Sequence, residues 1–127
     1  GSGYNAALLS VLVGPNGDIV SVEIEADLAE RAGSVLAAIG RDGVRILIAD
    51  GYEGDTQSAP YDRIVVTTGA QEIAPAWIEQ LTDGGRLVVP VVDQHSGAGS
   101  LHAFEKVEGE LQELAESPCA FLPMRRL

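Results

Sequence analysis

The stretch that most constrains the fold runs over residues 19–32 and is predicted to form a strand, a short turn and a helix. Residues 19–24 are rich in β-branched apolar side chains, which is typical of a strand covered on both faces. Asp27 then opens a helix that reaches about Ile39. Its expected buried side is Leu28, Ala32, Val35, Leu36 and Ile39.

Glu23 lies near the carboxyl end of this predicted strand. Nucleotide-binding α/β folds place an acidic residue there, because its carboxylate accepts hydrogen bonds from ribose hydroxyls. An ordinary exposed glutamate is an equally good interpretation of this stretch taken alone.

A glycine-containing segment precedes the strand. Gly1, Ser2 and Gly3 lead into a helical pattern over residues 4–13, and a turn cluster at residues 14–18 ends it. Glycines that open a helix allow backbone N–H groups to approach a ligand at the positive helix end. A single Gly-x-Gly is weak, and Gly1 and Ser2 also suit a cloning linker. The order Gly-x-Gly, helix, turn, strand and Glu is far more specific.

The rest of the chain continues the alternation of strands and helices. Strands are predicted at residues 44–49, 61–67 and 86–91, with Pro90 ending the pairing of the last, and a helix at 74–81 precedes a turn at 82–85. A hairpin over residues 101–114 turns at Glu108 and Gly109, and a terminal strand covers 118–124. The pattern predicts one α/β domain over residues 1–127, with parallel βαβ units and a closing antiparallel hairpin.

Several polar or small residues follow these strands. Asp50 and Gly51 end the second strand, where the carboxylate can accept from an exocyclic amine and glycine allows close approach. A simple Asp-Gly turn is the alternative. Ligands of such sheets bind beyond the carboxyl ends of the strands. Gly1, Gly3, Glu23, Asp50 and Thr67 are therefore expected at one edge, and their convergence is the functional signal.

Composition excludes several classes of protein. The 127 residues carry 8 Lys and Arg against 19 Asp and Glu, a net charge of -11, which disfavours nucleic acid and membrane surfaces as partners. No apolar run approaches a membrane span and no secretory leader is visible, while the single cysteine, Cys119, agrees with a reducing compartment, so we expect a cytoplasmic protein. His95 and His102 stand apart and are interpreted as surface or structural residues, so no metal is expected.

Seven stretches together resemble the protein-L-isoaspartate O-methyltransferase family: residues 1–9, 20–24, 28–32, 50–54, 59–67, 75–81 and 83–91. They occur in family order, whereas the tail after Val92 matches only loosely. The resemblance implies a Rossmann-like methyltransferase fold, a three-layer sandwich with a mostly parallel sheet and a C-terminal antiparallel hairpin. It also implies methyl transfer from S-adenosylmethionine (SAM) to an isoaspartyl carboxylate of a protein or peptide.

The same resemblance implies roles for individual residues. Gly1, Ser2 and Gly3 look like the later part of the SAM loop, Glu23 with Ile24 like the ribose contacts, and Asp50 with Gly51 like the adenine contacts. Thr67 looks like a further cofactor contact. Thr68, Gly69 and Ala70 look like a flexible tip beside the substrate. No catalytic residue is assigned.

The chain departs from the family pattern at its start, because the family's N-terminal segment and first strand are not visible in it. We therefore expect a carboxyl-side part that is inactive alone. The strands at 19–24 and 61–67 would then self-associate through unpaired edges, receive a strand from elsewhere, or pair directly. Three other functions stay open: a peptide-natural-product aspartate methyltransferase, a nicotinamide-dependent oxidoreductase, and a non-catalytic α/β interaction domain.

Overall fold

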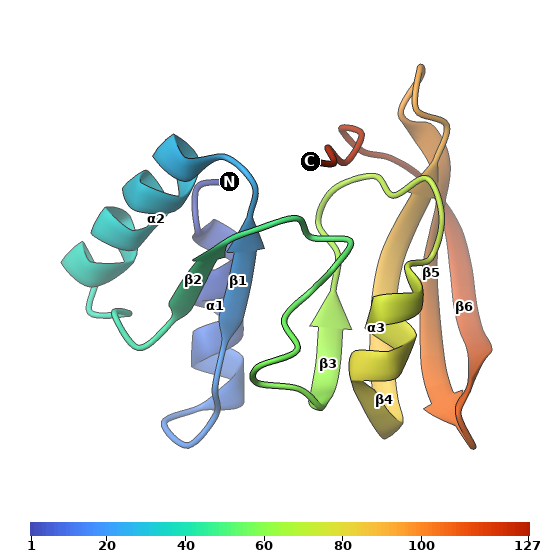
Figure 1. Cartoon of the computed structure of the whole chain (residues 1–127), viewed down its shortest axis with the longest axis horizontal. Coiled ribbons are helices and arrows are strands. Elements are labelled where there is room, and N and C mark those ends of the chain that lie inside the picture. The colour runs from blue at the N-terminus through green and yellow to red at the C-terminus, as the bar shows by residue number, and fades with distance from the viewer. The chain divides into compact units, whose positions relative to one another are not determined.

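The computed structural model describes all residues from 1 to 127, and they divide into two compact units (Figure 1). The first unit comprises Gly1–Gly51 with Arg126–Leu127, and the second comprises Tyr52–Arg125. The strands form one two-stranded and one four-stranded sheet. None of the three helices combines the length and the apolar character that a bilayer crossing requires. The expectation of one domain over the whole chain stays a prediction.

The first unit contains α1 (Tyr4–Val13), β1 (Val20–Glu23), α2 (Ala26–Ala38) and β2 (Arg45–Ile48). These are the four predicted elements, with bounds within two residues of those expected. β1 and β2 pair in parallel, with Glu23 opposite Ile48. Their carboxyl ends therefore lie at the same edge of the sheet.

The buried side of α2 was predicted only in part. Ala32 and Leu36 are buried as expected and Ala29 joins them, but the other three residues of the expected face are exposed, namely Leu28, Val35 and Ile39. Small residues at positions 29 and 32 let the helix pack closely, and Leu36 joins Ala6 and Val44 in the core. β1 is half-buried along its length, so the expectation of a strand fully covered on both faces is not met.

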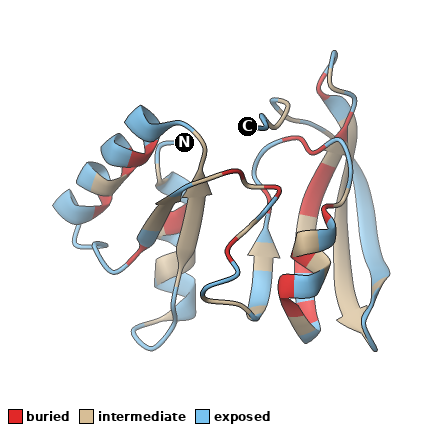
Figure 2. Ribbon diagram, in the orientation of Figure 1, coloured by how far each residue is buried: buried red, intermediate tan, exposed pale blue.

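The second unit contains β3 (Tyr61–Val65), α3 (Pro75–Gln80), β4 (Leu81–Val92), β5 (Ala98–Val107) and β6 (Glu110–Ala120). β3 runs parallel to β4, and β4, β5 and β6 form an antiparallel meander. The core lies between α3 and the sheet, where buried positions alternate along β4 (Figure 2). Trp77 of α3 stacks on Tyr52 with ring centroids 5.5 Å apart.

β4 is longer than predicted at both ends. The turn expected at residues 82–85 lies inside the strand, as an irregularity between the Tyr61–Leu81 and Arg63–Arg86 pairs. Pro90 does not end the pairing, which continues with β5 to Val92. β1 and β3 belong to separate sheets, so the idea that residues 19–24 and 61–67 pair directly is wrong.

The predicted hairpin is confirmed as β5 and β6. Glu108 (φ 50°) and Gly109 (φ 83°) both have positive φ, as a two-residue type I′ turn requires. The terminal strand predicted at 118–124 is wrong. Pro118 lies inside β6, which tolerates proline because it is an edge strand, and only Pro123 of the following residues forms a bridge, with Gly69.

Candidate functional site

Two acidic residues, Glu23 and Asp50, lie at the carboxyl edge of β1 and β2. Glu23 is the last residue of β1, and its carbonyl accepts a 3.1 Å hydrogen bond from the N–H of Ala49. That bond continues the parallel pairing to the residue immediately before Asp50. Both acids therefore follow adjacent strand ends in one unit, as the sequence predicted.

The carboxylate of Glu23 is fixed by two donors. One oxygen pairs with the ammonium group of Gly1, and the other accepts a 3.0 Å hydrogen bond from the N–H of Glu25. Partial burial raises the pKa of Glu23, but these hydrogen bonds, the charge of the ammonium group and the N–H of Ile24 outweigh it, so the pKa is lowered. A carboxylate offers about four acceptor positions, so further donors can still be accommodated.

The loop before α1 depends on the glycine at position 3. Gly3 has φ 83° and its carbonyl accepts a 2.9 Å hydrogen bond from Ala7, which starts the helix. A Cβ at Gly3 would lie 3.3 Å from Cβ of Ala32, so the loop passes close to α2. Ser2 Oγ accepts a 3.4 Å hydrogen bond from the N–H of Tyr4 at the start of α1, and the space where a Cβ of Gly1 would lie is open. The positive end of α1 can therefore face a ligand.

Asp50 is a buried acid, only 7% exposed, and Gly51 after it is half-buried. A carboxylate oxygen of Asp50 accepts a 3.0 Å hydrogen bond from the N–H of Leu127. The geometry of Asp50 thus supports a role as a fixed acceptor.

A hollow of about 460 Å³ opens beside the glycine loop, between α1 and α2. Its lining is mainly apolar and includes Leu28, Val35 and Ile39, with Arg31 at its border. Glu23 and Asp50 do not line it. The loop and the two acids suit a nucleoside with ribose hydroxyls and an exocyclic amine. The hollow, which is lined mainly by apolar side chains, suits packing against a hydrophobic group better than binding of a nucleoside.

The segment of residues 67–70 belongs to the second unit and begins two residues after the end of β3. Thr67 and Thr68 are exposed, whereas Gly69 and Ala70 are buried. Four backbone hydrogen bonds of 2.7–2.8 Å hold Gly69 and Ala70 between β4 and residues 122–124. The expected flexible tip at residues 68–70 is therefore firmly bridged through Gly69 and Ala70, and only Thr68 of the tip is exposed.

Two polar contacts of the second unit were not predicted. The hydroxyl of Tyr52 accepts a 2.8 Å hydrogen bond from the N–H of Gln71, next to Ala70. Gln80, at the end of α3, bridges the carbonyl of Glu53 and the N–H of Asp55. The position of Tyr52 after Asp50 and Gly51 is the only sequence signal that could have pointed to it.

Comparison with known proteins identifies relatives over nearly the whole chain. The family model described as protein-L-isoaspartate(D-aspartate) O-methyltransferase matches residues 1–126. A protein-L-isoaspartate O-methyltransferase from Methanopyrus kandleri is 42% identical over 126 residues, 98% of this chain and 55% of that protein. One from Archaeoglobus fulgidus is 45% identical over 93 residues, 73% of this chain and 42% of that protein. The chain thus spans about half the length of these curated relatives.

Solved structures show the same likeness. A protein-L-isoaspartate O-methyltransferase structure superposes with a TM-score of 0.88 at 34% identity, over 99% of this chain and 40% of that one. A candidate protein-L-isoaspartate O-methyltransferase from Plasmodium falciparum, in complex with S-adenosyl-L-homocysteine, gives 0.69 at 18% identity over 91% and 56%. The latter supports the fold alone. The predicted Rossmann-like methyltransferase fold is confirmed.

Proposed function

The chain belongs to the protein-L-isoaspartate(D-aspartate) O-methyltransferase family, and from this premise we propose that it forms part of a SAM-dependent carboxyl methyltransferase acting on isoaspartyl residues. The observation that carries the proposal is that Glu23 and Asp50 lie at the carboxyl ends of two paired strands, in the same unit as the glycine loop that opens α1. All three features lie in the first unit.

The residues of this edge would bind and orient the cofactor. Glu23, whose carboxylate accepts a hydrogen bond from the N–H of Glu25, would accept from the ribose hydroxyls, with Ile24 beside it. Asp50 and Gly51 would meet the adenine. Gly1, Ser2 and Gly3 would bring the positive end of α1 close to the ligand.

Bound SAM supplies an electrophilic methyl group on a sulfonium. The acceptor is a carboxylate that is already ionised at neutral pH, so the protein has mainly to position the two reactants in line. Thr67 and Thr68, which are exposed after β3, are the members of the segment of residues 67–70 whose side chains could contact cofactor or substrate. Gly69 and Ala70 would act through the backbone, and no residue is assigned a catalytic role.

The substrate could be damaged protein, which would make the enzyme a repair enzyme, or an aspartyl peptide. Only one cysteine is present, which supports a reducing compartment such as the cytoplasm. Enzymes that bind nicotinamide cofactors also have a glycine loop and an acidic residue at these places, but the family to which this chain belongs favours SAM. A non-catalytic α/β interaction domain would bind neither.

Calorimetry of the full-length protein with SAM and with NAD separates these functions. We expect SAM to bind and NAD not to bind. Glu23→Ala should weaken SAM binding about 10- to 150-fold, since a hydrogen bond to a charged group contributes roughly 1.5–3 kcal/mol. Glu30→Ala, which removes an exposed glutamate of α2, is the matched control and should leave the affinity unchanged.

Activity is then measured as methyl transfer to an isoaspartyl peptide and to its aspartyl counterpart. Transfer to the isoaspartyl peptide alone supports the repair function, and transfer to the aspartyl peptide supports peptide modification. An unchanged SAM dissociation constant in Glu23→Ala would remove Glu23 from the cofactor site. Absence of SAM binding by the parent would contradict the proposed function itself.

A further inference from the structure

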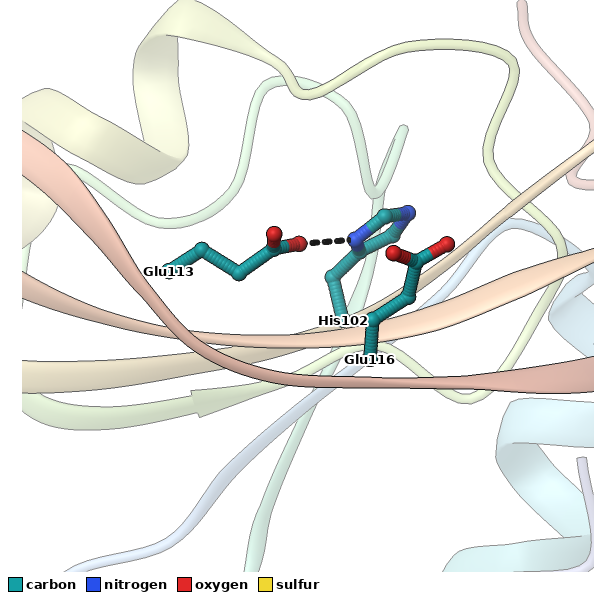
Figure 3. A group of neighbouring side chains, drawn as sticks. All are labelled: His102, Glu113 and Glu116. Carbon is teal, nitrogen blue, oxygen red and sulfur yellow. Dashed lines mark hydrogen bonds and ion pairs between the residues drawn. The ribbon is translucent and has the colours of Figure 1, made fainter.

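Three ligand-type side chains meet on the β5–β6 hairpin, and none of them belongs to the proposed cofactor site (Figure 3). They are His102 of β5 with Glu113 and Glu116 of β6, here called the His102 cluster. Nδ1 of His102 lies 2.5 Å from Oε1 of Glu113. One donor atom from each of the three residues can be chosen so that all lie within 4.8 Å of one another.

An irregularity in the pairing of β5 with β6 creates this cluster. His102 lies opposite Glu116 and Ala103 opposite Ala115, but Phe104 lies opposite Glu113, so Leu114 is an extra residue in β6. Side chains alternate along a strand, so residues three apart normally point to opposite faces. The extra residue returns Glu113 to the face of Glu116, and both carboxylates then face the imidazole.

The imidazole is held in place while the carboxylates remain accessible. The ring of His102 stacks on Phe104 with centroids 5.6 Å apart and planes 15° from parallel. The side chain of His102 is 20% exposed and that of Glu113 is 45% exposed. A cation can therefore reach the carboxylates from solvent, keep water ligands and meet a nitrogen donor of fixed orientation. The net charge of -11 also favours cations over anions.

We propose that the His102 cluster binds a divalent transition metal ion of the Zn²⁺ type. One imidazole nitrogen and two carboxylate oxygens are ordinary zinc ligands, and water completes the tetrahedron as in open zinc sites. Donors around a zinc ion lie about 3.3 Å apart when the bonds are 2.0–2.1 Å, so His102 and Glu113 need only a small separation from their present contact. The mixture of imidazole and carboxylate donors disfavours Mg²⁺ and Ca²⁺, which take oxygen ligands.

The ion would replace the hydrogen bond between His102 and Glu113 and join β5 to β6 through three side chains. This revises the prediction that His102 is a surface or structural residue. The sequence places Glu113 and Glu116 on opposite strand faces, and only the extra residue at Leu114 brings them together. The site does not depend on the proposed methyltransferase function.

The test is calorimetric titration of the protein with ZnCl₂ at neutral pH. The parent should bind one zinc ion, and His102→Gln and Glu116→Gln should each weaken zinc binding by more than about tenfold. Replacing a residue that only hydrogen-bonds a metal ligand already lowers metal affinity about 10- to 100-fold, and these two residues would be ligands themselves. Glu116→Gln removes one carboxylate and leaves the contact between His102 and Glu113 in place. His95→Gln and Glu110→Gln, which remove an exposed histidine and an exposed glutamate of β6, should bind zinc like the parent.

Thermal unfolding provides a second readout. Zinc should raise the melting temperature of the parent and of both controls, because a ligand that binds only the folded state stabilises it, and should raise that of His102→Gln far less. Circular dichroism without metal confirms that each variant is folded. Absence of zinc binding by the parent, parent-like binding by His102→Gln or Glu116→Gln, or equal loss in Glu110→Gln would overturn the proposal, the last by revealing general attraction to an acidic surface.

Discussion

Replacing Gln80 by leucine removes a buried amide that joins α3 to the loop of residues 53–55. Nε2 of Gln80 donates a 2.8 Å hydrogen bond to the carbonyl of Glu53, and Oε1 accepts a 2.9 Å hydrogen bond from the N–H of Asp55. Gln80 is 6% exposed and Asp55 is 9% exposed. Leucine has a similar size and no polar atom, so both backbone groups lose this partner.

The expected cost follows from the burial of these two groups. A buried polar group left without its hydrogen bond costs about 1–3 kcal/mol. The full cost applies to the buried N–H of Asp55, and a smaller cost applies to Glu53, whose side of the contact is closer to solvent. We expect Gln80→Leu to lower the free energy of unfolding by about 2–4 kcal/mol, a large part of the 5–15 kcal/mol typical of a domain.

Trp77 reports this loss directly. It is the only tryptophan, it is 3% exposed, and it lies in the same helix as Gln80. Urea unfolding followed by its fluorescence should show the midpoint falling by at least about 0.7 M, given a slope of roughly 1–3 kcal/mol/M. Gln71→Leu makes the same chemical change at an exposed position and serves as the control.

The comparison between the two variants decides the argument. Gln71→Leu should stay within about 0.5 kcal/mol of the parent, as is usual for surface substitutions. A loss in Gln80→Leu no greater than in Gln71→Leu would show that the amide bridge does not stabilise the second unit.

The remaining predictions concern Asp50, Gly54 and Asp93. Asp50→Asn should weaken SAM binding without shifting the unfolding curve; equal affinity would leave Asp50 as a turn residue. Gly54→Ala should lower the free energy of unfolding by more than about 1 kcal/mol, and by more than Gly84→Ala does. Both glycines have positive φ, but only a Cβ at Gly54 would clash with a neighbour, since it would lie 2.2 Å from Oε1 of Gln80. The N–H and hydroxyl of Ser96, with the N–H of His95, lower the pKa of Asp93 below its ordinary 3.8. The ionised carboxylate of Asp93 therefore stabilises its loop above pH 3.8, and this stabilisation is lost as the pH falls through the lowered pKa. Amide hydrogen exchange at Ser96, corrected for its intrinsic rate, should therefore become faster on acidification in the parent. It should not do so in Asp93→Asn.

The sequence by itself determined the features that depend on neighbouring residues. Gly3 and Gly14 flank α1, so its bounds were predicted to the residue. Alternating strand and helix patterns require parallel pairing in the first unit, and this placed Glu23 and Asp50 at one edge. Local rules suffice in these cases because helix caps, turns and side-chain alternation involve residues only a few positions apart.

Tertiary structure decided what depends on distant partners. The packing of α2 selected Ala29 over Leu28 for burial, and contacts with β4 and residues 122–124 bridged the segment expected to be flexible. The extra residue at Leu114 turned Glu113 toward His102, a change of face that no local pattern announces. A strand's register is set by the partner strand it pairs with, and a shift of one residue reverses the direction of every side chain beyond it.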